Sequence, residues 1–145
     1  MMTSGRREGH GVRLAGMRTV LLPDDPRFPA ALRVIPRPPK RLYVLGDPEA
    51  LTEGLAVVGA RMATPYGIGA AKRFARLAAQ RGIAVISGGA RGCDAAAHEA
   101  ALSEGAPTVA FLGGGCDVPY PREHAGLFER IALSGGAVVS EHAWD

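Results

Sequence analysis

The sequence lacks any long apolar segment. No stretch reaches the roughly 20 consecutive apolar residues that a transmembrane helix needs, and the N-terminal region has no apolar core of the kind found in secretory signals. These absences argue against a membrane-spanning or secreted protein. We therefore expect a cytoplasmic protein without membrane contact.

Cysteines are also scarce. Cys93 and Cys116 are the only two, and they do not form the closely spaced pairs that bind structural zinc. Both follow apolar runs that read as buried strands, and cytosolic thiols in such places stay reduced. We expect two free cysteines and no metal site.

The motifs of common nucleotide-dependent enzymes are missing as well. The P-loop pattern GxxxxGK[ST] is absent, and residues 59–67 do not have the GxGxxG spacing of a dinucleotide-binding turn. Ser87, His98 and Glu141 do not match a catalytic triad, because Ser87 lacks a GxSxG elbow. His98 lies along the following helix, where we expect a structural role. The sequence thus predicts no cofactor and no enzymatic activity.

Charge is unevenly distributed along the chain. Residues 1–41 carry nine Lys or Arg and three Asp or Glu, whereas residues 42–145 carry eight and eleven. The second part is therefore not a broadly basic body. Any nucleic-acid contact there must come from a local cluster, helped by the basic N-terminal part.

The N-terminal part has the composition of an extended arm. Residues 1–18 are rich in Gly and Arg without apolar periodicity, which predicts disorder. Residues 23–39 contain six prolines, which block long helices and interior strands. We expect residues 1–40 to form a basic, proline-rich arm, partly disordered, with one short helical turn around residues 29–34.

From residue 41 onward, apolar runs of strand length alternate with amphipathic helical segments. The runs are continuous, as in strands that are covered on both faces. Strands are expected at residues 42–45, 55–58, 83–86, 108–112 and 137–139, and helices at residues 66–81, 94–104 and 122–133. This alternation predicts that residues 41–145 form a single α/β domain with a Rossmann-like, doubly wound, mostly parallel sheet and helices on both faces.

Glycine-rich loops follow three of the expected strands. Parallel sheets bind ligands at the carboxyl ends of their strands, glycine allows close backbone approach, and arginine suits phosphate oxygens. Together these loops predict an anion site with Arg61 and Arg91 as its charges. The candidate contact residues are Gly59, Arg61, Thr64, Ser87, Gly88, Gly89, Arg91, Gly114, Gly115 and Asp117.

Four side chains near these loops have alternative roles. Arg91 either contacts phosphate or pairs with Asp94, which is itself expected to be a helix N-cap. Asp117 either caps a turn or binds a ribose or base edge. Tyr120 either stacks at the rim of the site or packs under the neighbouring prolines.

Four segments, in order, resemble the DprA/Smf family, the DNA-processing proteins of natural transformation. VVGARMATPYG is similar to the family segment with G-[SA]-R followed by T-x-Y-G, and SGGARGCDAAAHEAAL is similar to its second glycine-rich segment. FLGGGCDVPYPREH resembles the L-G-x-G-x-D-x-x-YP segment, and GGAVVSE the strand ending in SE. His124 stands where the family usually has Asn. Members continue past Ser-Glu into a basic segment, so the C-terminal part of the family domain is expected to be missing.

The resemblance implies an extended Rossmann fold that binds single-stranded DNA, delivers it to the recombinase RecA and forms homodimers. It implies a binding protein, with DNA contacts at Gly59 and Arg61 and at the second glycine-rich loop. Two alternatives remain open. One is a nucleotide-binding sensor or a phosphoribohydrolase-like protein, and the other is a degenerate scaffold that binds neither ligand.

Overall fold

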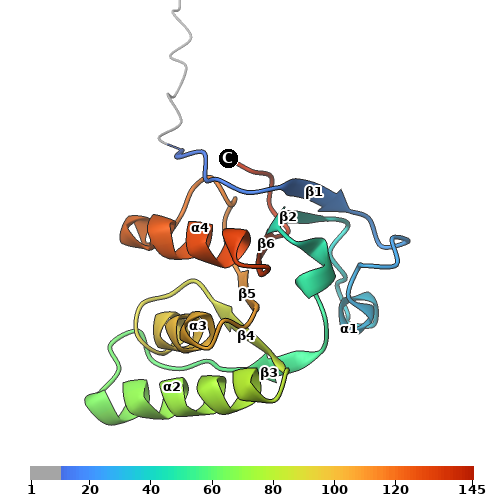
Figure 1. Ribbon diagram of the computed structural model, residues 1–145. Coiled ribbons are helices and arrows are strands. Elements are labelled where there is room, and N and C mark those ends of the chain that lie inside the picture. The colour runs from blue at the N-terminus through green and yellow to red at the C-terminus, as the bar shows by residue number, and fades with distance from the viewer. Residues whose placement is uncertain (1–10) are drawn as a thin grey trace, which may run out of the picture.

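The computed structural model describes residues 11–145, which form one six-stranded sheet with its helices (Figure 1). The strands are β1 (Arg18–Leu21), β2 (Leu42–Gly46), β3 (Gly54–Ala56), β4 (Ala84–Gly88), β5 (Thr108–Phe111) and β6 (Ala137–Ser140). The helices are α1 (Ala30–Arg33), α2 (Pro65–Gln80), α3 (Cys93–Ser103) and α4 (Ala125–Leu133), with 3-10 turns η1 (Pro48–Ala50) and η2 (Arg122–His124). Every expected strand and helix is present, and the helix expected from residue 122 begins as η2.

The strand order is β1-β2-β6-β5-β4-β3. The neighbours β3–β4, β4–β5 and β5–β6 are parallel and are connected in turn by α2, α3 and α4. At the other end, β2 is antiparallel to β6, and β1 is antiparallel to β2. The predicted α/β class with a mostly parallel sheet is confirmed. The carboxyl ends of β3 to β6 therefore lie along one edge.

The two faces of the sheet are covered unequally. Ala110 and Val138 face α4 in one core cluster, whereas Val109 and Val139 face Phe28 and the α1 region in another. The helices α2, α3 and α4 form one layer, and α1 lies on the other side of the sheet (Figure 1). Helices thus lie on both faces as predicted, but the only helical cover of the second face within residues 11–145 is short. None of these helices is long and apolar enough to cross a membrane.

The expected disorder of residues 1–18 is wrong for the part that the structure describes. Leu14 is 2% exposed and packs against α4 in the core, and Arg18 begins β1, a strand that the sequence reading missed. Phe28, in the proline-rich part, is also buried. The error has a physical cause, because this segment is ordered by contacts with residues about a hundred positions away. Residues 1–10 of the predicted arm lie outside the described residues.

Candidate functional site

A cleft of about 560 Å³ lies at the carboxyl ends of β4 and β5. This is the edge at which open α/β sheets bind ligands. Half of the predicted contact residues line the cleft, namely Arg61, Gly88, Gly89, Arg91 and Gly114. Asp94, Leu112, Gly113, Val118 and Tyr120 line it as well, although they were not among those candidates.

Arg61 brings a positive charge to the cleft that no described residue neutralises. Its side chain is exposed and makes no ion pair within residues 11–145. The backbone beside it is fixed, because the Cys93 N–H donates to the Ala60 carbonyl oxygen at 3.2 Å. Gly59 contributes to this anchoring, since a Cβ there would lie 2.6 Å from the Cys93 sulfur. Gly59 thus holds the loop in place and does not line the cleft.

Arg91 is paired, but not with the expected partner. Its Nε donates to Glu123 Oε1 at 2.7 Å, and this hydrogen bond raises the pKa of Arg91. The alternative of an Arg91–Asp94 pair is therefore wrong. Both side chains of the pair are more than half exposed, and exposed ion pairs contribute little to stability. Arg91 can therefore exchange the Glu123 carboxylate for a ligand anion at small cost.

Asp94 is not the N-cap of α3. The helix begins at Cys93 after Gly92, whose φ of 80° and ψ of −124° suit glycine alone, so Asp94 lies in the first turn. Its carboxylate is buried and accepts a hydrogen bond from the Ala90 N–H at 3.2 Å. A carboxylate in this place compensates the positive end of the helix dipole. The start of α3 thus carries its own anion, which reduces its value as a ligand site.

The glycines that line the cleft fall into two groups. A Cβ at Gly88 would lie 2.6 Å from Asp94 Oδ2, and one at Gly89 would lie 2.6 Å from Leu112 and 2.9 Å from Phe128. These two glycines permit close packing. A Cβ at Gly113 or Gly114 would meet nothing within 4 Å. Packing does not require glycine there, and what the bare backbone offers is close approach by a ligand.

Two predicted hydroxyl contacts serve the fold instead. Ser87 is 3% exposed, and its hydroxyl donates to the Val57 carbonyl oxygen, which ties the end of β4 to the chain leaving β3. Thr64 caps α2, because its hydroxyl oxygen accepts from the Gly67 N–H at 3.1 Å. Neither side chain lines the cleft.

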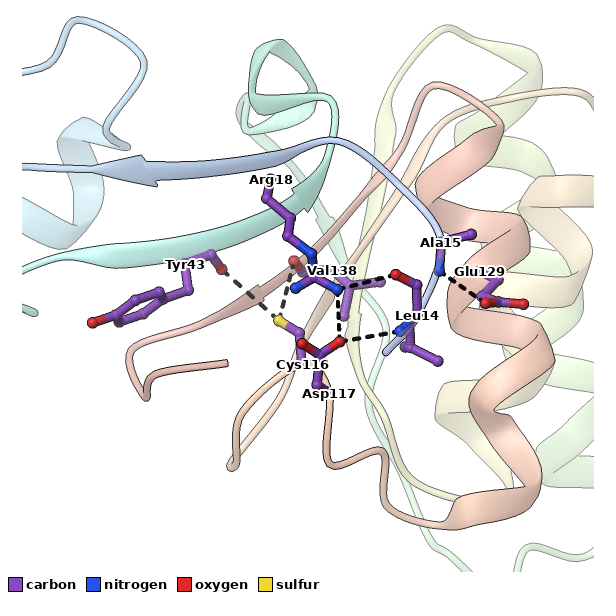
Figure 2. Close-up of polar contacts among 8 residues, drawn as sticks. All are labelled: Leu14, Ala15, Arg18, Tyr43, Cys116, Asp117, Glu129 and Val138. Carbon is purple, nitrogen blue, oxygen red and sulfur yellow. Dashed lines mark hydrogen bonds and ion pairs between the residues drawn. The ribbon is translucent and has the colours of Figure 1, made fainter. Parts of the chain in front are cut away.

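Gly115 and Asp117 also lie outside the cleft. A Cβ at Gly115 would lie 2.2 Å from the Ala143 carbonyl oxygen, so glycine is needed where the C-terminal residues cross. Asp117 Oδ1 accepts hydrogen bonds from Arg18 Nη2 at 2.7 Å and from the Leu14 N–H at 3.1 Å (Figure 2). Asp117 therefore fastens the N-terminal segment to the loop after β5. Its side chain makes no hydrogen bond within its own turn, and it does not line the cleft.

Cys116 lies in the same cluster. Its thiol is buried and donates to the Val138 carbonyl oxygen at 3.6 Å (Figure 2). Burial, reinforced by the neighbouring Asp117 carboxylate, raises the pKa of this thiol to about 12. Cys93 is likewise buried and free. Cys116 is thus held as an unreactive thiol.

His98 is a buried structural residue, as the sequence predicted. It is fully enclosed, with Nε2 lying 2.8 Å from the Gly88 carbonyl oxygen and Nδ1 lying 2.8 Å from Thr108 Oγ1. Desolvation by burial lowers the pKa of His98. The imidazole thereby holds the end of β4 from beneath the cleft.

Tyr120 and His124 shape the rim of the cleft. The Tyr120 side chain lines it and is 71% exposed, which favours the stacking alternative over packing under the prolines. His124 Nδ1 lies 3.0 Å from the Gly89 carbonyl oxygen, and its ring meets Phe128 edge-on. His124 therefore ties the loop after β5 to the loop after β4. Within residues 11–145, no three His, Cys, Asp or Glu side chains gather as metal ligands would.

Comparison with known proteins places these features in one family. A family model described as DNA recombination-mediator protein A matches residues 19–145. The chain is 37% identical over 127 residues to Protein Smf of Synechocystis, covering 84% of this chain and 32% of that protein. It is 42% identical over 130 residues to the putative DNA processing protein DprA of Mycobacterium tuberculosis, covering 80% of this chain and 33% of that protein.

Two solved structures resemble the fold. The X-ray structure of DprA from Streptococcus pneumoniae gives a TM-score of 0.76 at 30% identity, covering 86% of this chain and 44% of that one. A structure of DprA from Helicobacter pylori, described by its single-stranded DNA binding mode, gives 0.76 at 32% identity, covering 90% and 58%. The chain thus spans about a third of the length of the curated relatives, matching 32% and 33% of them.

Proposed function

Because this chain belongs to the DprA/Smf family, we propose that it binds single-stranded DNA in the cleft at the carboxyl ends of β4 and β5. In this proposal the protein binds DNA without catalysing a reaction, and it acts in the processing of DNA during transformation and recombination. It is supported by the relative from Helicobacter pylori, whose structure is described by its binding of single-stranded DNA.

One observation carries the proposal. The cleft combines the guanidinium of Arg61, which has no ion pair within residues 11–145, with two glycines, Gly113 and Gly114, where an added Cβ would meet open space. A guanidinium binds phosphate oxygens through a planar fork, and an unobstructed backbone lets N–H groups approach an anion. Contacts of this kind give affinity with little sequence preference. The exposed ring of Tyr120 adds a surface on which a base stacks.

The replacement Arg61→Ala tests the site. A hydrogen bond to a charged group contributes about 1.5–3 kcal/mol, so we expect the affinity for a fluorescent oligo-dT to fall roughly tenfold or more. The dependence of log K on log salt should become less steep by about 0.7, the contribution of one phosphate contact on a single strand. Fluorescence anisotropy at two salt concentrations measures both quantities.

The matched control is Arg73→Ala, which removes the same charge from the exposed surface of α2. It should leave the affinity nearly unchanged. Equal binding by the wild type and Arg61→Ala at both salt concentrations would remove Arg61 from the site.

Delivery of the strand to RecA, assembly as a homodimer and a cytoplasmic location belong to the same proposal, because the family resemblance implies them. Capture of purified RecA by the tagged chain, with and without oligo-dT, tests the first. Sedimentation of the purified chain tests the second. No capture in either condition would restrict the proposal to DNA binding alone.

A small nucleotide is the second candidate ligand. A volume of about 560 Å³ falls within the range of roughly 300–1,000 Å³ that is typical of small-molecule sites. Thermal-shift measurements against oligo-dT and a panel of mononucleotides separate the candidates, since a ligand stabilises the folded state that it binds. Stabilisation by mononucleotides alone favours a sensor, release of free base from AMP favours a phosphoribohydrolase, and no shift favours a scaffold.

A further inference from the structure

A second hollow lies along the same edge of the sheet as the cleft. It has a volume of about 520 Å³, and its lining includes Arg37, Lys40, Arg41, Tyr43, Glu141 and His142. Tyr43 of β2 pairs with Ser140 at the carboxyl end of β6, so this hollow lies at the edge where β4 and β5 also end. The proposed DNA cleft and this hollow are therefore separate sites on one edge.

The hollow carries an excess of positive charge. Arg37, Lys40 and Arg41 are exposed, and none of them forms an ion pair with any residue in the described part of the chain. Glu141 is the one carboxylate in the lining. Two prolines at positions 38 and 39 lie between the basic residues, and proline fixes the backbone φ. The basic segment therefore loses little backbone freedom when it binds a partner.

An aromatic ring lines the same hollow. Tyr43 meets Trp144 edge-on, with ring centroids 5.4 Å apart, and the Arg18 guanidinium lies 4.6 Å from the centre of the Trp144 ring. These contacts hold the Tyr43 ring in place beside the three cations. A groove of positive charge with aromatic side chains is the arrangement that binds single-stranded nucleic acid without sequence preference.

The spacing of the two sites matches a continuous strand. From β4 to β2 there are three strand spacings, through β5 and β6, or roughly 14 Å. A rise of about 3.4 Å per nucleotide places about four phosphates over that distance, and fewer if the strand is stretched.

We propose that Arg37, Lys40 and Arg41 form a second phosphate-binding surface that extends the DNA path from the cleft along the sheet edge to β2. This inference rests on the proposed binding of DNA at the cleft. It makes the site long enough that the bound length of DNA, and not only its charge, sets the affinity.

The test compares oligo-dT of two nucleotides, which is too short to span the roughly 14 Å between the sites, with oligo-dT of about fifteen nucleotides. Both are titrated by fluorescence anisotropy against the full chain at several salt concentrations. The variant is Arg37→Ala/Lys40→Ala/Arg41→Ala. The matched control, Lys72→Ala/Arg73→Ala/Arg81→Ala, removes three exposed positive charges from α2 and its C-terminal end. Melting temperatures of both variants establish that the fold is kept.

We expect the variant to bind the long oligonucleotide more weakly than the wild type does, with a salt dependence less steep by about two, since three contacts contribute about 0.7 each. Binding of the short oligonucleotide should be unchanged, and the control should bind both as the wild type does. Equal losses on the short and the long oligonucleotide, or an equal loss in the control, would overturn this inference while leaving the cleft proposal intact. A wild type that binds neither oligonucleotide overturns both.

Discussion

The two glycine-rich loops that form the cleft contain glycine for different reasons. At the end of β4 and in the loop that follows it, Gly88, Gly89 and Gly92 lie where an added Cβ would come within 2.6 Å of a neighbouring atom. In the loop after β5, Gly113 and Gly114 face open space. Similar sequence patterns thus describe a loop that is fixed by packing and a loop that is open to a ligand. The loop after β4 positions the site, and the loop after β5 is the better candidate for backbone contacts with a ligand.

The replacement Gly92→Ala is expected to have the largest effect on stability. A Cβ at Gly92 would lie 2.2 Å from the Ala60 carbonyl oxygen, and its backbone conformation is one that only glycine adopts readily. Overpacking costs about 1–3 kcal/mol and such a conformation about 1–3 kcal/mol, so we expect a loss of about 3 kcal/mol or more. Urea unfolding followed by circular dichroism measures it. A variant within about 0.5 kcal/mol of the wild type would contradict the packed description of this loop.

A smaller effect on stability is expected from acid, and it acts through His98, which lies beneath the end of β4. His98 holds the Gly88 carbonyl oxygen, and burial lowers the pKa of His98 below its ordinary value of 6.5. The folded state therefore favours the neutral ring. The contribution of neutral His98 to the free energy of unfolding is fully present above pH 6.5 and is lost as the pH falls below that value. We expect the free energy of unfolding to decrease as the pH falls below 6.5.

The variant His98→Asn should lose this pH dependence, whereas the control His142→Asn, at an exposed position, should retain it. Acidic groups act at lower pH. The Arg27 side chain, through its hydrogen bond, lowers the pKa of Asp25 to about 2, so the stability that this pair contributes is lost only below the ordinary Asp value of 3.8. A pH profile that is the same in His98→Asn and the wild type would show that another group is responsible.

The replacements Gly113→Ala and Gly114→Ala should have the smallest effect on stability. Nothing lies within 4 Å of the added Cβ at either position, so we expect a change within about 0.5 kcal/mol. Binding of oligo-dT should nevertheless weaken by about 1 kcal/mol, roughly fivefold, because the methyl group keeps a phosphate from the backbone. Thermal unfolding and anisotropy on the same samples separate the two effects. Unchanged binding by both variants would make this loop as structural as its neighbour.

The order of strands and helices from residue 41 onward could be predicted because each apolar run and each helical stripe is a local pattern. The N-terminal segment could not, since Leu14 is ordered by Asp117, 103 positions away, and no local pattern records such a contact. The same limit explains why the ion-pair partner of Arg91 was predicted wrongly, since that partner, Glu123, lies 32 positions along the chain. Asp94 was misassigned for another reason, because Gly92 is the N-cap and the helix therefore starts two residues earlier than it would with a side-chain cap at Asp94.

Within the cleft, the sequence indicated the right edge of the sheet but not which residues face it. Ser87 and Asp117 are polar residues within or close to glycine-rich segments, as ligand contacts often are, yet both join distant segments of the chain. Burial and hydrogen-bond partners distinguish a ligand contact from a structural contact, and the spacing of residues in the sequence predicts neither of them. Tyr120 shows the converse, because only its exposure of 71% places it at the rim.

Asp117 joins both ends of the described chain through the backbone groups of one residue. Its carbonyl oxygen accepts from the Val12 N–H at 2.9 Å, and its N–H donates to the Trp144 carbonyl oxygen at 2.7 Å. The two ends lie close together in the fold (Figure 1). Both segments are therefore fastened to the same loop, only a few residues from the open glycines of the cleft. The N-terminal and C-terminal segments thus share one anchoring residue beside the rim that Gly114 and Val118 line.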